Sequence, residues 1–335
     1  MPKSGEKRRP RRGSAGFWPR KRAKRIYPRI RSWPKVDQVV ALGHAGYKVG
    51  MTHMIVIDNR KNSPTYGEEI WIPVTIIETP PLKVCGIRFY KLTPYGYKTL
   101  TEVWAENIDQ RVLRKIPTLR TNGDVEQRLK QIEQILPEVS EIRLIVHTQP
   151  WLAGIGKKTP EVFEIAIGGE NIQEKFEYAK KLLGNDLKIQ DVFKEGMQID
   201  VSAVTKGKGF QGEIKRFGVK LMHHKAEKKR RKTGNRGPEG LARVLPTVPM
   251  PGQMGFHTRT EYNKWIIKIS DNPDEINPKS GWPHYGIVRT TWIAVKGSVP
   301  GPVKRLIRLR YPVRPNPKIP SEPPQIVYIS TAPKN

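Results

Sequence analysis

Apolar and β-branched residues recur along the chain in short runs of the length typical of strands. These runs predict strands at Met54–Ile57, Trp71–Ile77, Val84–Tyr90, Ile142–His147, Val162–Ile167, Met197–Val204, Trp265–Ile269, Ile287–Val295 and Leu306–Val313. Their number predicts a fold that is mixed α and β and rich in β structure.

Two segments instead repeat their apolar residues every three or four positions, over 125–136 and 172–183, and we expect an amphipathic helix in each. Pro137 ends the first pattern. For the second, Asn171 provides an N-cap and Gly184 a C-terminal stop. Both helices fall within one stretch of the chain, which we therefore expect to be an α+β unit between β-rich flanks.

Charge is the property that most restricts the function. The chain of 335 residues has 61 Lys and Arg against 31 Asp and Glu, a net charge of +30. Segment 1–35 carries a net +13, segment 205–260 a net +11 and segment 296–320 a net +7, whereas the other 219 residues net −1. A nearly neutral protein with three basic segments indicates a polyanionic partner. Nucleic acid is the expected partner, and an acidic membrane surface is the alternative.

Several kinds of site find no support in the sequence. The single cysteine, Cys85, excludes an internal disulfide and a Cys-rich zinc site. No apolar run approaches the roughly 20 residues that span a bilayer, and no apolar stretch of a secretory signal follows the basic N-terminus. No nucleophile can be matched with a base, and the scattered histidines lack accompanying thiolates or carboxylate pairs. We therefore predict no catalytic residue, metal or cofactor.

The stretch GKGFQG, residues 207–212, fits the G-x-G-x-x-G pattern of a dinucleotide-binding turn. Such a turn also needs a helix at its last glycine and an acidic residue about twenty positions later. The next residues show no helical stripe, and the later position is Lys232. A P-loop at 154–159 fails too, with Trp151 where glycine is required and Lys158 where Ser or Thr is required. The stretch is interpreted as a glycine-rich turn that either contacts phosphate or only needs positive φ.

The residues that follow this turn are strongly cationic. Nine Lys and Arg lie within 24 residues: Lys220, Lys225, Lys228, Lys229, Arg230, Arg231, Lys232, Arg236 and Arg243. His223, His224 and three glycines are interleaved, and little apolar material is present. Because such a segment is too charged to fold alone, we expect it to thread into folded RNA.

Two terminal segments are also expected to be ordered only against a partner. The first 35 residues contain few aliphatic side chains, and residues 300–335 hold nine prolines, which favour extended structure. Aromatic residues are interleaved with the N-terminal cations, at Phe17, Trp18, Tyr27 and Trp33. They either stack on unpaired bases or pack on the folded part of the protein itself, and the sequence leaves both open.

The run from Phe193 to Arg216 has the form F-x6-D-x2-A-x-T-x-G-K-G-x2-G-x3-R. It resembles the signature of the universal large-subunit ribosomal protein three family. The resemblance continues in GFWPRKRAKRIYPRIRSWPK (16–35), LGHAGYKVGMTHM (42–54), TEVWAE (101–106), PGQMGFHTRTEYNK (251–264) and VKGSVPGPVKRLIRLR (295–310). The long N-terminal arm is similar to that of archaeal and eukaryotic members. The sequence departs from the pattern at Glu239, where members often carry tryptophan.

The resemblance implies a translation-protein-type β-barrel with an inserted α+β unit and extended basic segments that penetrate RNA. On this chain the implied parts are a basic N-terminal extension at 1–40, a barrel core from 41–95 with 185–210 and 257–312, the inserted unit at 96–184, a basic glycine-containing finger at 211–256 and a proline-rich C-terminal tail at 313–335.

The function implied by the resemblance is structural and not enzymatic, in the cytoplasm within the ribosome. The protein would bind near the 3′ end of the large-subunit rRNA, nucleate assembly and extend its finger toward the peptidyl-transferase centre. Its partners would be that rRNA and neighbouring large-subunit proteins, with no membrane and no small-molecule substrate. We predict rRNA contacts at Arg8, Arg9, Arg11, Arg12, Trp18, Arg20, Lys21, Arg22, Lys24, Arg25, Lys206, Lys208, Lys215, Arg216, Lys220, His223, His224, Lys228, Lys229, Arg230, Arg231, Lys232, Arg236, Arg243, His257, Arg259, Lys304 and Arg305.

Two competing hypotheses belong to other classes. A nucleotide-dependent or RNA-modifying enzyme would use GKGFQG to hold a nucleotide. A general nucleic-acid compacting protein would rest on charge alone and would not distinguish rRNA from an arbitrary duplex.

Overall fold

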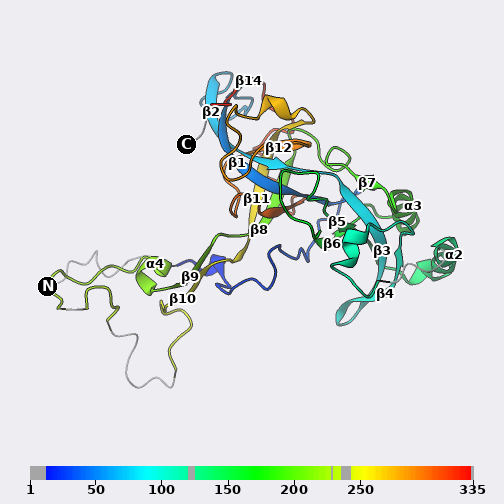
Figure 1. Ribbon diagram of the computed structural model, residues 1–335, viewed down its shortest axis with the longest axis horizontal. Helices are drawn as coiled ribbons and strands as arrows, with labels where there is room; N and C mark the ends of the chain where they lie inside the picture. Colours follow the sequence, from blue (N-terminus) through cyan, green and yellow to red (C-terminus); the bar gives the residue numbers. More distant parts are fainter. Residues whose placement is uncertain (1–12, 120–124, 228, 235–242, 333–335) are drawn as a thin grey trace. The chain divides into compact units, whose positions relative to one another are not determined.

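The computed structural model describes residues 13–119, 125–227, 229–234 and 243–332 (Figure 1). The described residues form two compact units. The basic unit comprises those within 13–26 and 204–259, and the core unit comprises those within 27–203 and 260–332.

The larger sheet belongs almost entirely to the core unit. Its strands are β1 (Gly43–Ile57), β2 (Glu69–Glu78), β8 (Gln198–Val204), β11 (Thr258–Ser270), β12 (Trp292–Lys296), β13 (Leu306–Arg310) and β14 (Ile326–Ile329). They are ordered β13-β8-β11-β12-β2-β1-β14, and β1 also pairs with β13. The sheet is therefore closed into a barrel of six strands, with β14 attached to the far half of β1.

Closure of the barrel depends on two glycines in β1. A Cβ atom on Gly46 would lie 2.6 Å from the carbonyl oxygen of Glu78 in β2. A Cβ atom on Gly43 would lie 2.7 Å from the carbonyl oxygen of Leu309 in β13. Any larger residue at either position would push the neighbouring strand away, which explains the small residues in this otherwise apolar strand.

The second sheet of the core unit has the order β4-β3-β5-β6, with β7 paired to β3. Its strands are β3 (Leu82–Thr93), β4 (Gly96–Trp104), β5 (Glu141–His147), β6 (Val162–Ala166) and β7 (Asp186–Leu187). The boundary expected at residue 96 falls inside the β3–β4 hairpin, where Thr93 pairs with Gly96. Strands β3 and β4, on either side of that boundary, therefore belong to the same sheet.

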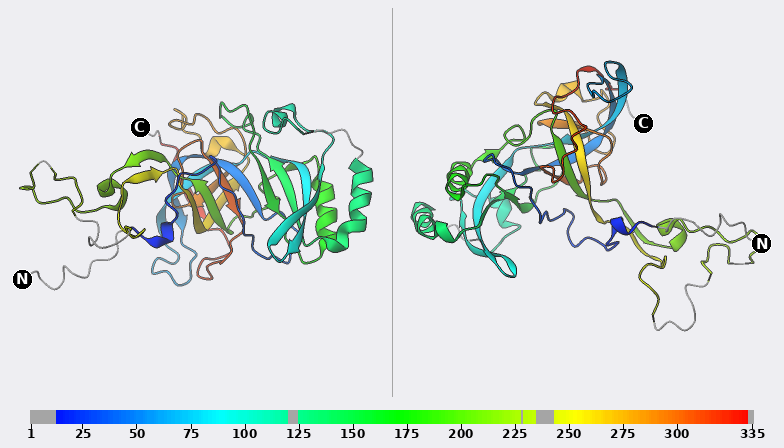
Figure 2. Two further views of the ribbon diagram at one scale, coloured as in Figure 1. Left: turned by 90° about the horizontal axis from the view of Figure 1, so that it is seen from below. Right: turned by 180° about the vertical axis from the view of Figure 1, so that it is seen from behind.

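Helices α2 (Val125–Ile135) and α3 (Ile172–Leu182) pack along one side of this sheet (Figure 2). Both predicted helices are confirmed. The Asn171 side chain accepts a hydrogen bond from the Gln173 amide, and Gly184 follows α3 with a φ of +80°. Shorter helical segments are α1 (Gln110–Leu113), η3 (Leu136–Glu138) and η4 (Pro273–Glu275). No helix among the described residues is long and apolar enough to cross a membrane.

Most predicted strands are confirmed, with one clear exception. The run predicted from Ile287 becomes a strand only at Trp292. The amides of Arg289 and Thr290 donate instead to the buried Glu78 carboxylate, at 2.8 and 3.0 Å, so the chain cannot join a ladder there. Strands β4, β7, β9, β10 and β14 were not predicted. β4 is mostly exposed, so it lacks the apolar alternation of a half-buried strand.

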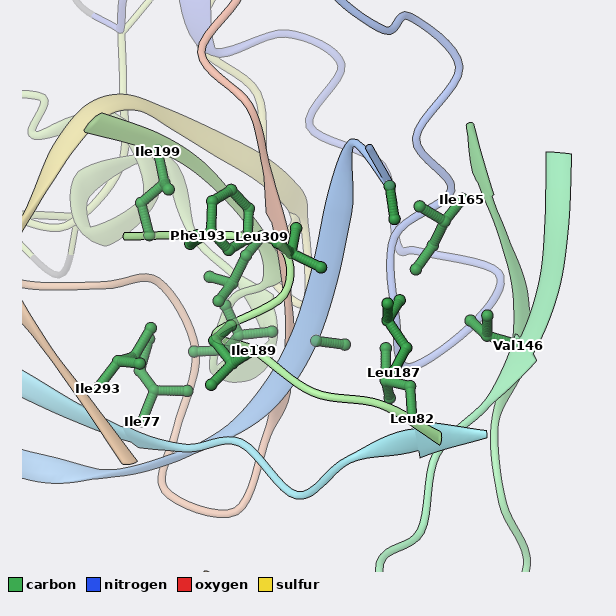
Figure 3. Close-up of a cluster of buried hydrophobic side chains, with 14 of the residues drawn as sticks. Ile77, Leu82, Val146, Ile165, Leu187, Ile189, Phe193, Ile199, Ile293 and Leu309 are labelled. Atoms are coloured by element: carbon green, nitrogen blue, oxygen red, sulfur yellow. The ribbon is translucent and has the colours of Figure 1, made fainter. Parts of the chain in front are cut away.

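One hydrophobic cluster joins the two sheets of the core unit. Leu82, Val146 and Leu187 belong to strands of the second sheet, whereas Phe193 and Ile293 lie on the barrel side of the cluster (Figure 3). The chain after β7 runs between the two groups and continues the core from one sheet to the other (Figure 3). The sheets therefore share a single interior.

Described parts of both terminal segments pack on the core unit of the protein itself. Tyr27 and Ile30 are buried, and the Tyr27 hydroxyl donates to the Val162 carbonyl at 3.1 Å. The Arg310 guanidinium donates to the Ser32 carbonyl at 2.8 Å. At the other end, β14 pairs with β1. The expectation that these segments need a partner is therefore wrong for residues 27–32 and for β14.

In the basic unit, β9 (Gly207–Gln211) and β10 (Gly252–Gly255) form an antiparallel ribbon. Helix α4 (Glu213–Phe217) follows β9, although no helix was expected there. It has only five residues, too few to show an apolar period in the sequence. The described part of the N-terminal segment contains a 3-10 turn, η2 (Ala15–Phe17).

Candidate nucleic-acid interface

Gly207 and Gly209 of GKGFQG lie in strand β9 of the ribbon, and Gly212 is the N-cap residue of the short helix α4. Gln211 pairs with Gly252, and Gly207 pairs with Gly255. Gly255 has a φ of +71°, and a Cβ atom there would lie 2.0 Å from the carbonyl oxygen of Lys206. The two strands thus approach too closely for any other residue at 255. This antiparallel arrangement differs from the parallel βαβ unit of a dinucleotide turn.

Arg216 holds helix α4 against the ribbon. Its guanidinium donates to the carbonyl of Gln253 at 3.0 Å and to that of Met250 at 2.8 Å. Burial lowers the pKa of Arg216. This predicted RNA contact is therefore already engaged inside the unit, where it fixes the position of neighbouring cations.

His257 and Arg259 bind the N-terminal segment in the same way. A ring nitrogen of His257 lies 2.9 Å from the Lys21 carbonyl oxygen, and the Arg259 guanidinium donates to the Phe17 carbonyl at 2.5 Å. Burial lowers the pKa of both side chains. The backbone adds a bond from the Ala23 amide to the Phe256 carbonyl at 2.8 Å. The two distant basic segments are thereby joined into one unit.

The chain after α4 folds back on itself. The Met222 amide donates to the Arg230 carbonyl at 3.1 Å, which closes a loop. Beyond this loop the Thr233 hydroxyl donates to the carboxylate of Glu213 at the start of α4. Glu213 is only 7% exposed, so one of the few acids of this unit is directed inward and removed from the surface.

The surface of the basic unit is consequently cationic. Its exposed Lys and Arg among the described residues are Lys21, Arg22, Lys24, Arg25, Lys206, Lys208, Lys215, Lys220, Lys225, Lys229, Arg230, Arg231, Lys232 and Arg243. The exposed rings of His223 and His224 lie 4.1 Å apart beside them. Arg20 is half-buried, with a guanidinium that donates to the Ser14 carbonyl at 2.8 Å.

Some predicted contacts lie elsewhere or outside the described residues. Lys304 is exposed and Arg305 half-buried, both in the core unit. The predicted contacts outside the described residues are Arg8, Arg9, Arg11, Arg12, Lys228 and Arg236, and the departure at Glu239 also lies there.

The N-terminal aromatic residues divide between the two alternatives. Tyr27 is buried and Trp33 packs against the core, so both serve the fold. Phe17 and Trp18 are 60% and 41% exposed. Sequence reasoning missed Phe210, which is 75% exposed on β9. The available signal was an aromatic residue within a stretch of glycine and lysine.

No group of three or more His, Cys, Asp or Glu suited to a metal ion occurs in the part of the chain that the structure describes. The single cysteine, Cys85, is buried, and burial raises the pKa of its thiol to about 12. It is therefore protonated at neutral pH and unsuited to nucleophilic chemistry.

Residues 1–335, the entire chain, match the family model of ribosomal protein L3. The chain belongs to the ribosomal protein L3 family. Within this L3 family it is 53% identical over 329 residues to the large ribosomal subunit protein uL3 of Archaeoglobus fulgidus, covering 97% of this chain and 98% of that protein. It is 50% identical over 335 residues to the uL3 of Nanoarchaeum equitans, covering all of both chains. Membership in the L3 family makes the chain a ribosomal protein of the large subunit.

Proposed function

We propose that this protein is a structural rRNA-binding constituent of the large subunit, with the basic unit as its RNA-binding surface. The observation that carries the proposal is the exposure of 14 Lys and Arg on the described part of this unit, while Glu213 is buried. Phosphate contacts supply most of the affinity of such surfaces. The resemblance to the L3 family adds the location: near the 3′ end of the rRNA, with residues 211–256 directed toward the peptidyl-transferase centre, in cytoplasmic ribosomes.

Aromatic side chains would add stacking to this electrostatic attraction. Phe17, Trp18 and Phe210 are exposed on the same unit as the cations. A base stacked on an aromatic ring contributes about 1–3 kcal/mol. Leaving such rings in water has no benefit for the free protein, so their exposure favours a partner with unpaired bases.

The two competing hypotheses make different predictions. An enzyme that uses GKGFQG should bind a nucleotide saturably, and a calorimetric titration with no heat would contradict it. A general compacting protein should bind an arbitrary duplex as tightly as rRNA. The antiparallel ribbon geometry weighs against the first, and the defined loop and ribbon weigh against the second.

Cross-linking of the protein to RNA in cells, followed by sequencing of the attached fragments, tests the location. We expect reads near the 3′ end of the large-subunit rRNA and a second cluster at the peptidyl-transferase region. Reads scattered over many RNAs would leave only a nonspecific basic protein.

The salt dependence of rRNA binding tests the surface itself. Contact with about ten phosphates predicts a log–log slope of roughly −7 to −9. Changing Lys229, Arg230, Arg231 and Lys232 to alanine should make the slope less steep by about 3 if all four contact phosphate. The matched control changes four exposed lysines of the core unit, Lys61, Lys98, Lys130 and Lys181, and should leave the slope nearly unchanged. Equal slopes for the two variants would refute the assignment.

A further inference from the structure

The second half of β1 turns one row of side chains outward from the barrel. Met54 and Val56 are buried, whereas Met51, His53 and Ile55 alternate with them and lie partly or fully in solvent. Strand geometry places alternate residues on one face, so these three share the outer surface.

The outer row of β1 is extended on both sides by neighbouring strands. Ile55 lies directly opposite Trp71 of β2 and Tyr328 of β14. Trp71 is 61% exposed and Tyr328 is 48% exposed. The rings of His53 and Trp71 lie 5.6 Å apart. Met51, His53, Ile55, Trp71 and Tyr328 are here called the apolar stripe.

The apolar stripe is held in a fixed conformation by the chain on either side. At one end the Thr52 hydroxyl donates to the Ser330 carbonyl at 2.8 Å. At the other end the Ile57 amide donates to the Gln325 carbonyl at 2.9 Å. β14 is therefore fastened to β1 beyond both of its ends, and a binding partner would not have to order it.

The strands that carry the apolar stripe lack the positive charge that is abundant elsewhere in the protein. The chain has 61 Lys and Arg, yet none lies at positions 51–57, 69–78 or 326–329. Glu68 and Glu69 are exposed three and two positions before Trp71. Nucleic acid requires cations, whereas grouped exposed aromatic and aliphatic side chains are typical of protein interfaces.

We propose that the apolar stripe is the docking site of another large-subunit protein. The partner segment would place apolar side chains over Ile55 and Trp71 and would direct Lys or Arg toward Glu68 and Glu69. The inference rests on the proposed function only in placing the chain in the large subunit, and it does not depend on rRNA binding by the basic unit.

A photo-cross-linking amino acid at Trp71 or at Tyr328, in full-length chain assembled into large subunits, tests the partner. Mass spectrometry should identify one other protein, linked through an apolar segment with adjacent Lys or Arg. Cross-links to rRNA, to a second copy of this chain or to nothing at both positions would overturn the proposal.

Substitutions then test how much the apolar stripe contributes to the affinity for the partner protein. Trp71→Ala and Tyr328→Ala should each weaken binding of the purified cross-linked protein to the full-length chain, by about thirtyfold for the tryptophan. The control is Tyr95→Ala, because Tyr95 is fully exposed in the β3–β4 turn and lies outside the apolar stripe. Circular dichroism and rRNA binding should be unchanged in all three variants. If Trp71→Ala or Tyr328→Ala lost only rRNA binding, the assignment of the basic unit as the RNA-binding surface would be contradicted. If all three variants bound the partner protein with equal affinity, the proposed docking site would be wrong.

Discussion

The buried arginines of the core unit and the exposed arginines of the basic unit serve different purposes. In the core unit, Arg310 donates to the fully buried Asp200 carboxylate at 2.6 Å. Arg308 is also buried, and burial lowers its pKa to about 9. In the basic unit, Arg230 and Arg231 are exposed.

The number of Lys and Arg residues in the sequence therefore overestimates how many cations are available for binding. Segment 296–320 carries a net +7, yet both arginines of β13 are interior and hold backbone carbonyl groups. A guanidinium has five N–H donors, so it can satisfy several buried acceptors at once. Three basic segments in the sequence thus become one basic unit and a third segment that largely serves the fold.

Loss of the buried ion pair between Arg310 and Asp200 should change the stability of the protein most. Arg310→Ala would leave the Asp200 carboxylate buried with only amide donors, those of Asn263 and Val313. We expect the free energy of unfolding to fall by about 3–5 kcal/mol, measured in urea by the fluorescence of the buried Trp292. Arg230→Ala is the matched control and should change it by no more than about 0.5 kcal/mol. Similar values for the two variants would remove the contrast between the units.

The buried His44 of the core unit should make the stability of the protein depend on pH. His44 is 1% exposed, its Nε2 lies 3.1 Å from the Leu187 carbonyl oxygen, and burial lowers its pKa from 6.5 to about 4. Below pH 6.5 the unfolded chain therefore binds a proton that the folded chain excludes. Stability from this group is present above pH 6.5 and is lost as the pH falls to about 4.

The loss amounts to about 3 kcal/mol, from about 1.4 kcal/mol per pKa unit. Urea unfolding at pH 7.5 and pH 4.5 should show this loss of stability in the wild type and not in His44→Gln. The part of the pH dependence that both proteins share, which comes from carboxylates, is subtracted first. The exposed-site variant Lys220→Ala should keep the wild-type pH dependence. An unchanged pH dependence in His44→Gln would mean that burial of His44 does not set the acid limit.

The smallest effect separates two glycines of the basic unit. Gly209 and Gly255 have φ values of +66° and +71°, but a Cβ atom at Gly209 would meet no atom within 4 Å. Gly209→Ala should weaken the ribbon by about 1 kcal/mol through backbone strain, and Gly255→Ala by about 2 kcal/mol or more because the Lys206 carbonyl blocks it.

Hydrogen exchange of the Phe256 amide, which donates to the Lys206 carbonyl at 3.0 Å, reports the opening of the ribbon. Exchange should quicken about fivefold for Gly209→Ala and about thirtyfold or more for Gly255→Ala. Equal rates would show that positive φ, and not close approach, selects glycine at 255.

The sequence patterns predicted mainly the local features of the fold. The apolar period of 172–183 and the cap at Asn171 predicted α3, because a helix is built from neighbours three and four positions apart. Most barrel strands followed from short apolar runs, and the family signature at 193–216 predicted the family correctly. The charge of the segments at 1–35 and 205–260 predicted a basic region, since no fold can bury so many unpaired cations.

Which of the cationic side chains face solvent depends on how distant parts of the chain pack together. Arg310 finds the Ser32 carbonyl 278 positions away, and Arg259 finds the Phe17 carbonyl 242 positions away. Such partners are backbone groups, which look alike at every position of a sequence. The ribbon of β9 and β10 likewise depends on pairing across more than 40 residues. Composition therefore shows that cations are abundant, and chain packing over long distances decides whether each one faces solvent or the interior.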